Sequence, residues 1–498
     1  MDKYRPVIGL EIHAELSSQR KMFCGCLNNS DETKPNANVC PVCLAHPGTL
    51  PVANRKPIEM MIKIGVAVGG RIAEQARFYR KNYFYPDLPK GYQITSQPEP
   101  FVIGGSLRVG GREIKIDHIH LEEDTGTLIH DKSDKHTLVD FNRAGVPLME
   151  LVTEPVIESG IEARRFAEEL QLLLRYLGVA EANMEKGEMR CEVNISLTAV
   201  SEIAERRGQN ADLREKEQKK VKLGTKVEIK NLNSFRAVEK AVEFEVGRQS
   251  KVLEAGEKVI QETRGWDESK GETVSQRRKE EAHDYRYFPE PDLPPFRLAD
   301  FGVEAIKENI PELPAEKRER LQKEYDLSGG QAETLVADIK LVEFYERAVS
   351  EFEADERGVP YGIIYNYLVS DLRGLMKSEG IGFKTLKVTP ENFADLTAMV
   401  AKGEIGSRVA KDVLKEMFMQ GADPEAIIKE RGLTQVGDEE QLREAVKKVI
   451  SGNEKVVGDY KKGKKAAIKF LVGQAMKETR GRGEPKMIEK LLEEELGK

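Results

Sequence analysis

The chain has 498 residues, of which 39% are hydrophobic and 33% charged, and a formal net charge of −7 at pH 7. This length suits two or three domains with a substantial core, and the net negative charge argues against nucleic-acid binding over the whole surface. No stretch reaches the apolar length of a membrane span, and the opening MDKYRPV lacks the apolar core of a signal peptide. We therefore expect a cytoplasmic protein with no membrane partner.

The first predicted element is a strand over residues 9–16, GLEIHAEL. Successive side chains of a strand point to opposite faces, so Glu11, His13 and Glu15 share one face and the apolar residues between them share the other. Taken alone, such a strand is more often an ordinary solvated face than a metal site. The functional interpretation depends on whether the pattern recurs.

Four cysteines follow this strand. Cys24 and Cys26 form C-x-C, and Cys40 and Cys43 form C-x-x-C. Because the cytosol is reducing, this spacing favours a tetrahedral Zn²⁺ site over disulfides. Four thiolate ligands leave no open coordination position, so the zinc would be structural; the alternative is that the cysteines are unpaired. The fifth, Cys191, lies on the apolar face of a later strand and is predicted to be a small core residue.

A helix is predicted near residues 58–68, and the segment RKNYFYPDLPKGYQITSQ comes after it. This segment carries Lys81, Tyr83, Tyr85 and Lys90. Cations and phenols of this kind can grip phosphate oxygens and line a polar conduit. A surface loop would explain the same residues equally well.

The acidic pattern of residues 9–16 returns in IDHIHLEED and in VPLMELVTEP. In the first segment His118, His120 and Glu122 share one face, and Glu123 and Asp124 follow. In the second, Glu150 and Glu154 alternate with apolar residues. Two carboxylates about 5 Å apart repel by roughly 3 kcal/mol at an effective dielectric near 20, so a cluster must be protonated, spread apart or neutralised by a cation. Carboxylates with some imidazole suit Mg²⁺ or Mn²⁺. Since magnesium shares its ligands with substrate phosphates, nucleotide chemistry is the first hypothesis.

Further along, an amphipathic helix is predicted over residues 161–177. RCEVNISL and KVEIKNLNSF continue the polar faces of one antiparallel sheet, with Arg190 and Glu192 on the first of them. Between these strands, residues 201–224 form a highly charged stretch that we interpret as an exposed loop.

The prolines of YRYFPEPDLPP, residues 285–295, forbid a regular helix and mark a boundary. Beyond residue 314 the pattern is helical, with a run at 360–378 and a helix that Thr389 caps and Pro390 opens. A second break lies at residues 403–406. We place domain boundaries near 293 and 405.

The end of the chain is basic. Between Asp459 and Lys486 there are nine Lys or Arg residues against three acids, a local charge of +6 in a chain whose net charge is −7. This segment predicts an anionic partner.

Several common catalytic motifs are absent from the sequence. It contains no G-x-x-x-x-G-K-[ST] loop, no Rossmann glycine pattern and no G-x-S-x-G elbow. If ATP is used, a P-loop does not hold it. No cysteine or serine lies in an obviously activated setting, which disfavours a self-contained hydrolase or glutaminase.

Long segments of the chain resemble the GatB subunit of the tRNA-dependent amidotransferases, the GatB/GatE family. They are GLEIHAEL, RKNYFYPDLPKGYQI, HLEEDTG, NRAGVPLMELVTEP, RCEVNISL, EIKNLNSF, DYRYFPEPDLPP and KFLVGQAMK. The resemblance covers essentially the whole chain, which is too short for the synthetase-like insertion of the archaeal GatE. It implies an α+β fold: a cradle-like antiparallel-sheet catalytic domain at 1–293, an all-α helical domain at 294–405 and a small helical tail of the YqeY type at 406–498.

The activity that this resemblance implies is that of an ATP-dependent carbon–nitrogen ligase with glutamine as the amido-nitrogen donor. ATP, with Mg²⁺, would phosphorylate the side-chain carboxylate of glutamate or aspartate misacylated onto tRNA, and ammonia would displace the phosphate. The ammonia would come from an amidase-like glutaminase subunit, which together with a small third subunit completes a heterotrimer. Whether Glu-tRNA(Gln), Asp-tRNA(Asn) or both is the substrate stays open.

The resemblance also implies residue roles. His13, Glu123 and Glu150 would hold Mg²⁺, while Glu11 and Glu122 would serve a second ion or the nucleotide phosphates. The residues implied along the ammonia route are Lys81, Tyr83, Lys90, Arg190 and Glu192, the last standing where the family usually has aspartate. Those implied to meet tRNA phosphates are Lys461, Lys462, Lys464, Lys465, Lys469, Lys477, Arg480 and Arg482.

Two other classes of function remain open. A metal-dependent phosphoesterase would use the carboxylates as a two-metal site, and a non-catalytic tRNA-binding scaffold would use them only structurally. An ATP requirement without phosphatase turnover excludes the first, and metal bound by the acidic residues excludes the second.

Overall fold

A computed structural model describes residues 3–29, 31–130, 136–200, 223–278, 284–353, 361–433, 439–462, 464, 466–479, 483 and 485–497. The chain divides into two compact units, Met1–Ala315 and Glu316–Lys498. Most of the predicted charged stretch at 201–224 lies outside the described residues. No described helix is both long enough and apolar enough to cross a membrane.

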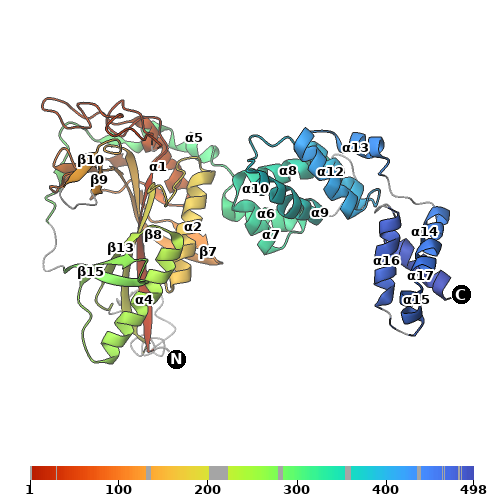
Figure 1. Cartoon of the computed structure of the whole chain (residues 1–498). Coiled ribbons are helices and arrows are strands. Elements are labelled where there is room, and N and C mark those ends of the chain that lie inside the picture. Colours follow the sequence, from red (N-terminus) through yellow and green to blue (C-terminus); the bar gives the residue numbers. More distant parts are fainter. Residues whose placement is uncertain are drawn as a thin grey trace, which may run out of the picture. The chain divides into compact units, whose positions relative to one another are not determined.

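The first unit is built on strands (Figure 1). They are β1 (Tyr4–Glu15), β2 (Arg71–Ile72), β3 (Gln75–Ala76), β4 (Tyr79–Asn82), β5 (Tyr92–Thr95), β6 (Val102–Ile103), β7 (Ser106–Val109), β8 (Arg112–Glu123), β9 (Thr127–His130), β10 (Thr137–Asp140), β11 (Pro147–Thr153), β12 (Met189–Ala199), β13 (Val227–Leu232), β14 (Glu262–Asp267), β15 (Glu272–Arg278), β16 (Phe288–Pro289) and β17 (Phe296–Arg297). Its helices are α1 (Arg55–Ala67), α2 (Gly160–Tyr176), α4 (Phe235–Glu254), the 3₁₀ turn η1 (Leu298–Phe301) and α5 (Val303–Glu308).

Most of these strands form one sheet of 13 strands, with the order β15-β14-β13-β12-β1-β11-β8-β5-β4-β16. β6 and β7 also pair with β8, and β2 pairs with β6. The pairs in this sheet are antiparallel as predicted, except that β13 and β14 are parallel. Parallel neighbours need a crossover connection, and α4 supplies it. β1 lies at the middle of the sheet and pairs with both β11 and β12.

The apolar face of this sheet forms the core of the first unit. Leu10, Ile12 and Ala14 of β1 are fully buried. The helices α2 and α4 pack side by side against the sheet (Figure 1). The helix α1 contacts β6 and β8. The period-two alternation of residues 9–16 is therefore confirmed, because this face is covered by helices and the opposite face keeps the acids.

The boundary between the two units lies later in the sequence than the predicted position near 293. The first unit runs to Ala315 because β17 still pairs with β3 and α5 still packs on α1. The prolines mark an irregular segment within this unit. The boundary near 405 stays a prediction.

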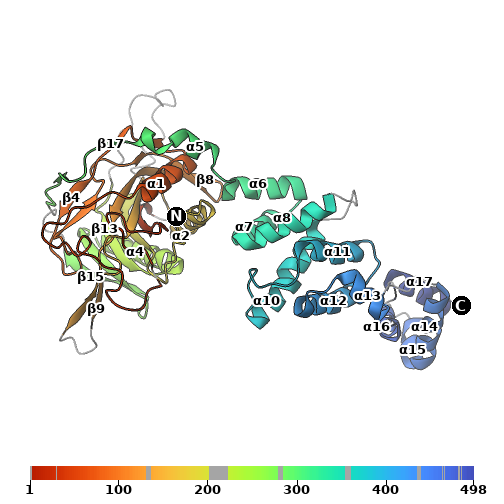
Figure 2. The same cartoon turned by 90° about the horizontal axis from the view of Figure 1, so that it is seen from above.

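The described residues of the second unit form helices only (Figure 2). They are α6 (Pro314–Tyr325), α7 (Gly329–Val336), α8 (Ile339–Glu353), α9 (Tyr361–Asn366), the π-helical η2 (Tyr367–Leu372), α10 (Arg373–Glu379), α11 (Pro390–Ala401), α12 (Ser407–Gln420), α13 (Pro424–Arg431), α14 (Glu439–Gly452), α15 (Glu454–Lys461), α16 (Ala467–Glu478) and α17 (Pro485–Leu496). Thr389 caps α11 through Asn392 N–H and Pro390 opens it, as predicted. The last four helices surround a core of their own that includes Leu442, Leu471 and Leu491.

Candidate functional site

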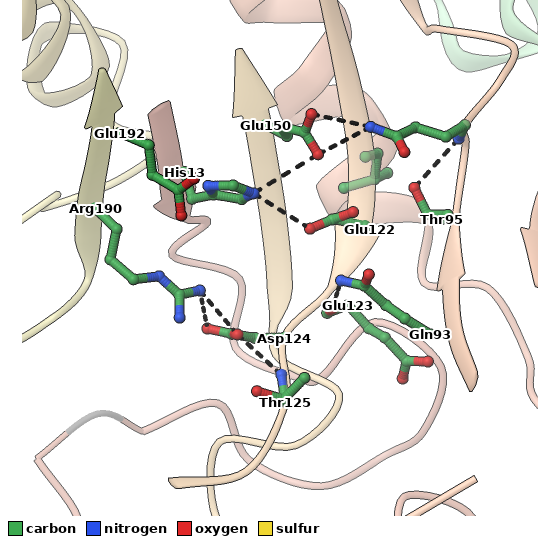
Figure 3. A network of polar contacts seen from close by, with 12 residues as sticks. His13, Gln93, Thr95, Glu122, Glu123, Asp124, Thr125, Glu150, Arg190 and Glu192 are labelled. Atoms are coloured by element: carbon green, nitrogen blue, oxygen red, sulfur yellow. Dashed lines mark hydrogen bonds and ion pairs between the residues drawn. The ribbon is translucent and has the colours of Figure 1, made fainter. Parts of the chain in front are cut away.

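The polar face of the sheet is assembled by strand register. β1 lies between β11 and β12, so that His13 is paired with Glu150 on one side and Arg190 on the other. Glu150 is in turn opposite His120 of β8. Because all these strands present the same face at these positions, residues far apart in the sequence converge (Figure 3).

Glu11, His13 and Glu150 form what we call the acidic cluster. Each offers one ligand atom, and these atoms all lie within 4.8 Å of one another. The Nε2 atom of His13 is 3.6 Å from Glu150 Oε2 and 3.6 Å from Glu122 Oε1, so Glu122 adjoins the cluster. An imidazole thus lies between carboxylates from two neighbouring strands.

The charges in this cluster depend strongly on one another. Burial disfavours the imidazolium of His13, but its ion pair with Glu150 and the charges of Glu122 and Glu11 raise its pKa to about 9. Burial likewise opposes ionisation of Glu150, yet His13 lowers its pKa to about 2. For Glu122, burial and the charge of Glu150 raise the pKa to about 7. The site thus contains more carboxyl groups than the single positive charge of His13 can neutralise.

These residues fit a divalent cation. Glu122 is 2% exposed, and its Oε2 atom is buried without a hydrogen-bond partner. A buried carboxylate oxygen without a partner is costly, and a cation beside it would remove that cost. Carboxylate oxygens with one imidazole nitrogen are a ligand set for Mg²⁺ or Mn²⁺.

The four cysteines form a second group, the cysteine cluster, consisting of Cys24, Cys26, Cys40 and Cys43. Their sulfur atoms all lie within 4.8 Å of one another. The Cys40 N–H donates to Cys43 Sγ at 3.1 Å. A hydrogen bond with Cys24 and this backbone bond lower the pKa of Cys43 to about 5, against the effect of burial. Four converging sulfurs fit a structural Zn²⁺.

The side chain of Lys21 lies beside the cysteine cluster. Lys21 is fully buried, with its Nζ atom 3.9 Å from Cys43 Sγ and 3.3 Å from the Phe141 carbonyl oxygen. An ammonium group in this position favours thiolate over thiol. Cys191 is buried in the sheet core, as predicted.

Comparison with known proteins agrees with this geometry. Residues 6–304 match the family model described as the GatB/GatE catalytic domain, and residues 344–496 match the one described as the GatB domain. The chain belongs to the GatB/GatE family.

Relatives of this family match the chain from end to end. A protein of Persephonella marina, named as the B subunit of aspartyl/glutamyl-tRNA(Asn/Gln) amidotransferase, is 44% identical over 99% of both chains. Proteins with the same name from Thermoanaerobacter sp. and Thermotoga neapolitana are also 44% identical, over at least 99% of each chain. The resemblance seen in the sequence motifs is therefore confirmed over the full length.

Glu123, the third residue predicted to bind Mg²⁺, lies apart from the acidic cluster. Glu123 accepts hydrogen bonds from Lys90 Nζ at 2.8 Å and from the Ile94 N–H at 2.9 Å. With Lys90 and Cys43 it lines a cavity of about 250 Å³. Adjacent residues of a strand face opposite ways, so Glu122, and not Glu123, shares the face of His120. The metal role of Glu123 stays a prediction.

The residues predicted along the ammonia route fall into three places. Lys81 and Tyr83 pack around the Tyr285 ring, whose centroid is 5.2 Å from Lys81 Nζ and 6.2 Å from the Tyr83 ring. Burial opposes the charge of Lys81, but Glu122, Tyr287 and Glu150 raise its pKa. Lys90 lies with Glu123.

The other two route residues are ion-paired on β12. Arg190 pairs with Asp124 at 2.9 Å, and Glu192 pairs with Lys230 at 2.9 Å. That these five residues line one conduit stays a prediction.

The sequence did not single out Arg143, which joins two of the acids. Its Nε atom is 2.7 Å from Glu15 Oε1 and 2.7 Å from Asp124 Oδ2. Burial alone would raise the pKa of Asp124, but Arg190 and Arg143 lower it to about 2. Glu15 and Asp124 thus have arginine counter-ions, whereas Glu150 relies on His13. A lone arginine in NRAGVPLMEL gave no signal of this role.

The basic residues predicted to meet tRNA are only partly described. Lys461, Lys462, Lys464, Lys469 and Lys477 are exposed. Lys464 lies 3.3 Å from Asp459, an exposed ion pair of little energetic weight. Lys465, Arg480 and Arg482 lie outside the described residues.

Proposed function

We propose that this chain is the activating subunit of an ATP-dependent amidotransferase that converts glutamate or aspartate, misacylated onto tRNA, into the corresponding amide. Membership of the GatB/GatE family and the names of its full-length relatives support this. The enzyme would be a carbon–nitrogen ligase in which glutamine, hydrolysed by a partner subunit, supplies the ammonia. Its place would be the cytoplasm, where tRNA is charged.

The observation that carries the proposal is the convergence of Glu11, His13 and Glu150 within 4.8 Å on the polar face of the sheet. A carboxylate resists nucleophiles, so its oxygen must first attack the γ-phosphorus of ATP, releasing ADP. Ammonia then attacks the carbonyl carbon of the acyl phosphate, and phosphate leaves. Bound Mg²⁺ would neutralise charge on the transferring phosphoryl group.

The side chains around the cluster suit this task. Glu11, His13 and Glu150 would hold the cation, and Glu122 with its unpartnered buried oxygen would complete the set or serve a second ion. Glu123 would bind the same cation only if its ion pair with Lys90 were broken. Zn²⁺ in the cysteine cluster would stabilise the loop that carries it.

Partners follow from what the chain lacks. The sequence has no nucleophile motif of a glutaminase, and its relatives are named as one subunit of an amidotransferase. We propose an amidase-like glutaminase and a small third subunit as the other members of a heterotrimer. Ammonia would arrive past Lys81, Tyr83 and Lys90, and then Arg190 and Glu192, while the basic tail would contact tRNA phosphates.

The test is reconstitution of the complex with ATP, Mg²⁺, glutamine and each misacylated tRNA. We expect amide formation with Glu-tRNA(Gln), with Asp-tRNA(Asn) or with both, and none after chelation of Mg²⁺ or omission of ATP. Amidated tRNA that accumulates without ATP or divalent metal would refute the assignment. Phosphate release that does not depend on tRNA or ammonia would favour a phosphoesterase, and a cluster that binds no metal would favour a scaffold.

A further inference from the structure

Gln97, which follows β5, is not a member of the acidic cluster but forms hydrogen bonds with one of its residues, Glu150. Its Nε2 atom donates to Glu150 Oε1 at 2.9 Å and to Glu150 Oε2 at 3.1 Å, two bonds drawn as dashed lines at Glu150 in Figure 3. The Oε1 atom of the same amide accepts a hydrogen bond of 2.7 Å from the Tyr287 hydroxyl. One side chain thus connects a cluster carboxylate to a tyrosine of a distant segment.

The chemistry of the three groups allows only one arrangement. An ionised carboxylate only accepts hydrogen bonds, so the NH₂ end of the Gln97 amide must face Glu150. The amide oxygen then faces away and needs a donor, which the Tyr287 hydroxyl supplies. The Gln97 NH₂ group donates to Glu150 and the Gln97 amide oxygen accepts from Tyr287, so every donor and acceptor in this series has a suitable partner.

The position of Tyr287 is itself fixed by the sheet. The Asn82 side chain at the end of β4 donates to the carbonyl oxygens of Tyr285 at 3.1 Å and Arg286 at 2.8 Å. Phe288, the next residue after Tyr287, pairs with Arg80 of β4. These bonds fix the backbone on both sides of Tyr287, whose hydroxyl reaches the Gln97 amide.

Glu150 has few other ways to be held. It is 4% exposed, and the ion-pair partner of its side chain among the described residues is His13, whose Nε2 atom is 3.6 Å from Glu150 Oε2. Ligating carboxylates need partners outside the metal's own coordination sphere to keep their orientation. Gln97 is such a partner, because its amide reaches both oxygens of Glu150.

We propose that Gln97 is a positioning residue: held by the Tyr287 hydroxyl, it fixes the Glu150 carboxylate in the orientation with which the acidic cluster binds a divalent cation. This inference rests on the proposed function in one respect, namely that the cluster binds Mg²⁺. It adds that the segment around Tyr287 helps to set the affinity for that cation.

The experiment measures Mn²⁺ binding, as a probe for Mg²⁺, by electron paramagnetic resonance on the full-length chain with zinc already supplied. Gln97→Leu removes both bonds at nearly constant volume, and we expect it to weaken Mn²⁺ binding about 10- to 100-fold, as for other partners of metal ligands. Tyr287→Phe removes one neutral hydrogen bond and should weaken binding about two- to tenfold. Gln171→Leu is the control, because Gln171 donates to the Ala182 carbonyl oxygen at 2.6 Å, away from the cluster.

The Mg²⁺ dependence of the enzymatic activity is a second measurement, and a purely structural role of Gln97 would leave it unchanged. In the reconstituted complex, Gln97→Leu should raise the Mg²⁺ concentration for half-maximal amide formation, while saturating Mg²⁺ restores kcat and the KM for tRNA stays the same. Melting temperatures of all variants serve to identify misfolding. If Gln97→Leu does not fold, Tyr287→Phe decides the question by the same measurement.

The outcomes separate this inference from the proposed function. Wild-type protein that binds no Mn²⁺ would overturn both. Wild-type binding that Gln97→Leu and Tyr287→Phe leave within twofold would overturn the positioning role alone. An equal loss in Gln171→Leu would overturn it too, because the effect would not be specific to Glu150.

Discussion

The cysteine cluster draws all four ligands from residues 24–43, whereas the acidic cluster joins Glu11 and His13 of β1 to Glu150 of β11. The cysteine cluster can form within a single loop, without contacts to other strands. The acidic cluster exists only after two strands have paired in one register. Ligand sets within a loop can therefore be recognised from spacing, while sets that cross a sheet need the register as well.

The two clusters also differ in coordination and in charge. Four thiolates complete a tetrahedral site and leave no position for substrate. The acidic cluster has three members, with Glu122 beside them, and a cation there would keep positions for waters or phosphates. We therefore expect the cysteine cluster to stabilise the fold and the acidic cluster to take part in the chemistry. Each of the following changes tests that expectation.

The largest effect is expected in the cysteine cluster. Structural Zn²⁺ can contribute on the order of 10 kcal/mol to the folding of its local unit, so Cys40→Ser should release zinc and loosen residues 24–43. Zinc content and hydrogen exchange of this segment measure the change. The control is Cys191→Ala, which removes a core thiol outside the cluster and should keep its zinc. Wild-type protein that contains no zinc when purified without chelator would contradict the site.

The next largest effect is expected on amide formation. His13→Ala and Glu150→Gln each remove one ligand and misplace charge at the transferring phosphoryl group, which should slow amide formation by on the order of a thousandfold or more. Basal, tRNA-independent glutamine hydrolysis by the partner subunit should persist.

Glu154→Gln is the matched control for this experiment, since Glu154 lies just beyond β11 and outside the acidic cluster. A His13 or Glu150 variant with near wild-type kcat would remove the cluster from the chemistry. Loss of glutaminase activity in a folded, assembled variant would mean that the two active sites are coupled.

A smaller effect is expected from pH. In the metal-free protein the pKa of His13 is raised to about 9, and only neutral imidazole binds a metal. Between the Glu122 pKa of about 7 and the His13 pKa, binding must therefore release one proton, so Mn²⁺ affinity should rise by up to about tenfold per pH unit there and level off above the His13 pKa. Titrations at several pH values measure this slope. Affinity that is flat between neutral pH and the His13 pKa would show that His13 is not a ligand.

The smallest effects are expected from single lysines of the tail. Each phosphate contact adds roughly 0.9 to the magnitude of the salt slope on duplex-like nucleic acid, so Lys461→Gln, Lys462→Gln or Lys469→Gln should each lower it by at most about that amount. Removing the tail from Gly406 should lower it further while activation chemistry persists. tRNA affinity measured against salt concentration tests this.

Lys270→Gln, in the β14–β15 turn of the first unit, is the control for these lysines. A tRNA affinity and salt slope that do not change after tail removal would exclude the tail from the binding surface.

Much of the candidate site could be predicted from local pattern. The alternation in residues 9–16, the spacing of Cys24 to Cys43 and the cap at Thr389 depend on neighbours in the sequence, and each is present in the structure. The alternation in IDHIHLEED also placed Glu122 on the face of His120. Motif resemblance instead favoured Glu123, which the structure pairs with Lys90.

The sequence by itself determined which strands carry acids, which loop carries four thiols and where the chain turns helical, because side-chain periodicity and capping act over a few residues. Only the tertiary structure decided that Glu150 meets His13, that Arg143 lies between Glu15 and Asp124, and that Gln97 links Glu150 to Tyr287. Those contacts join residues that are far apart in the chain. Strand register and the packing of irregular segments bring them together, and neither leaves a periodic trace in the sequence.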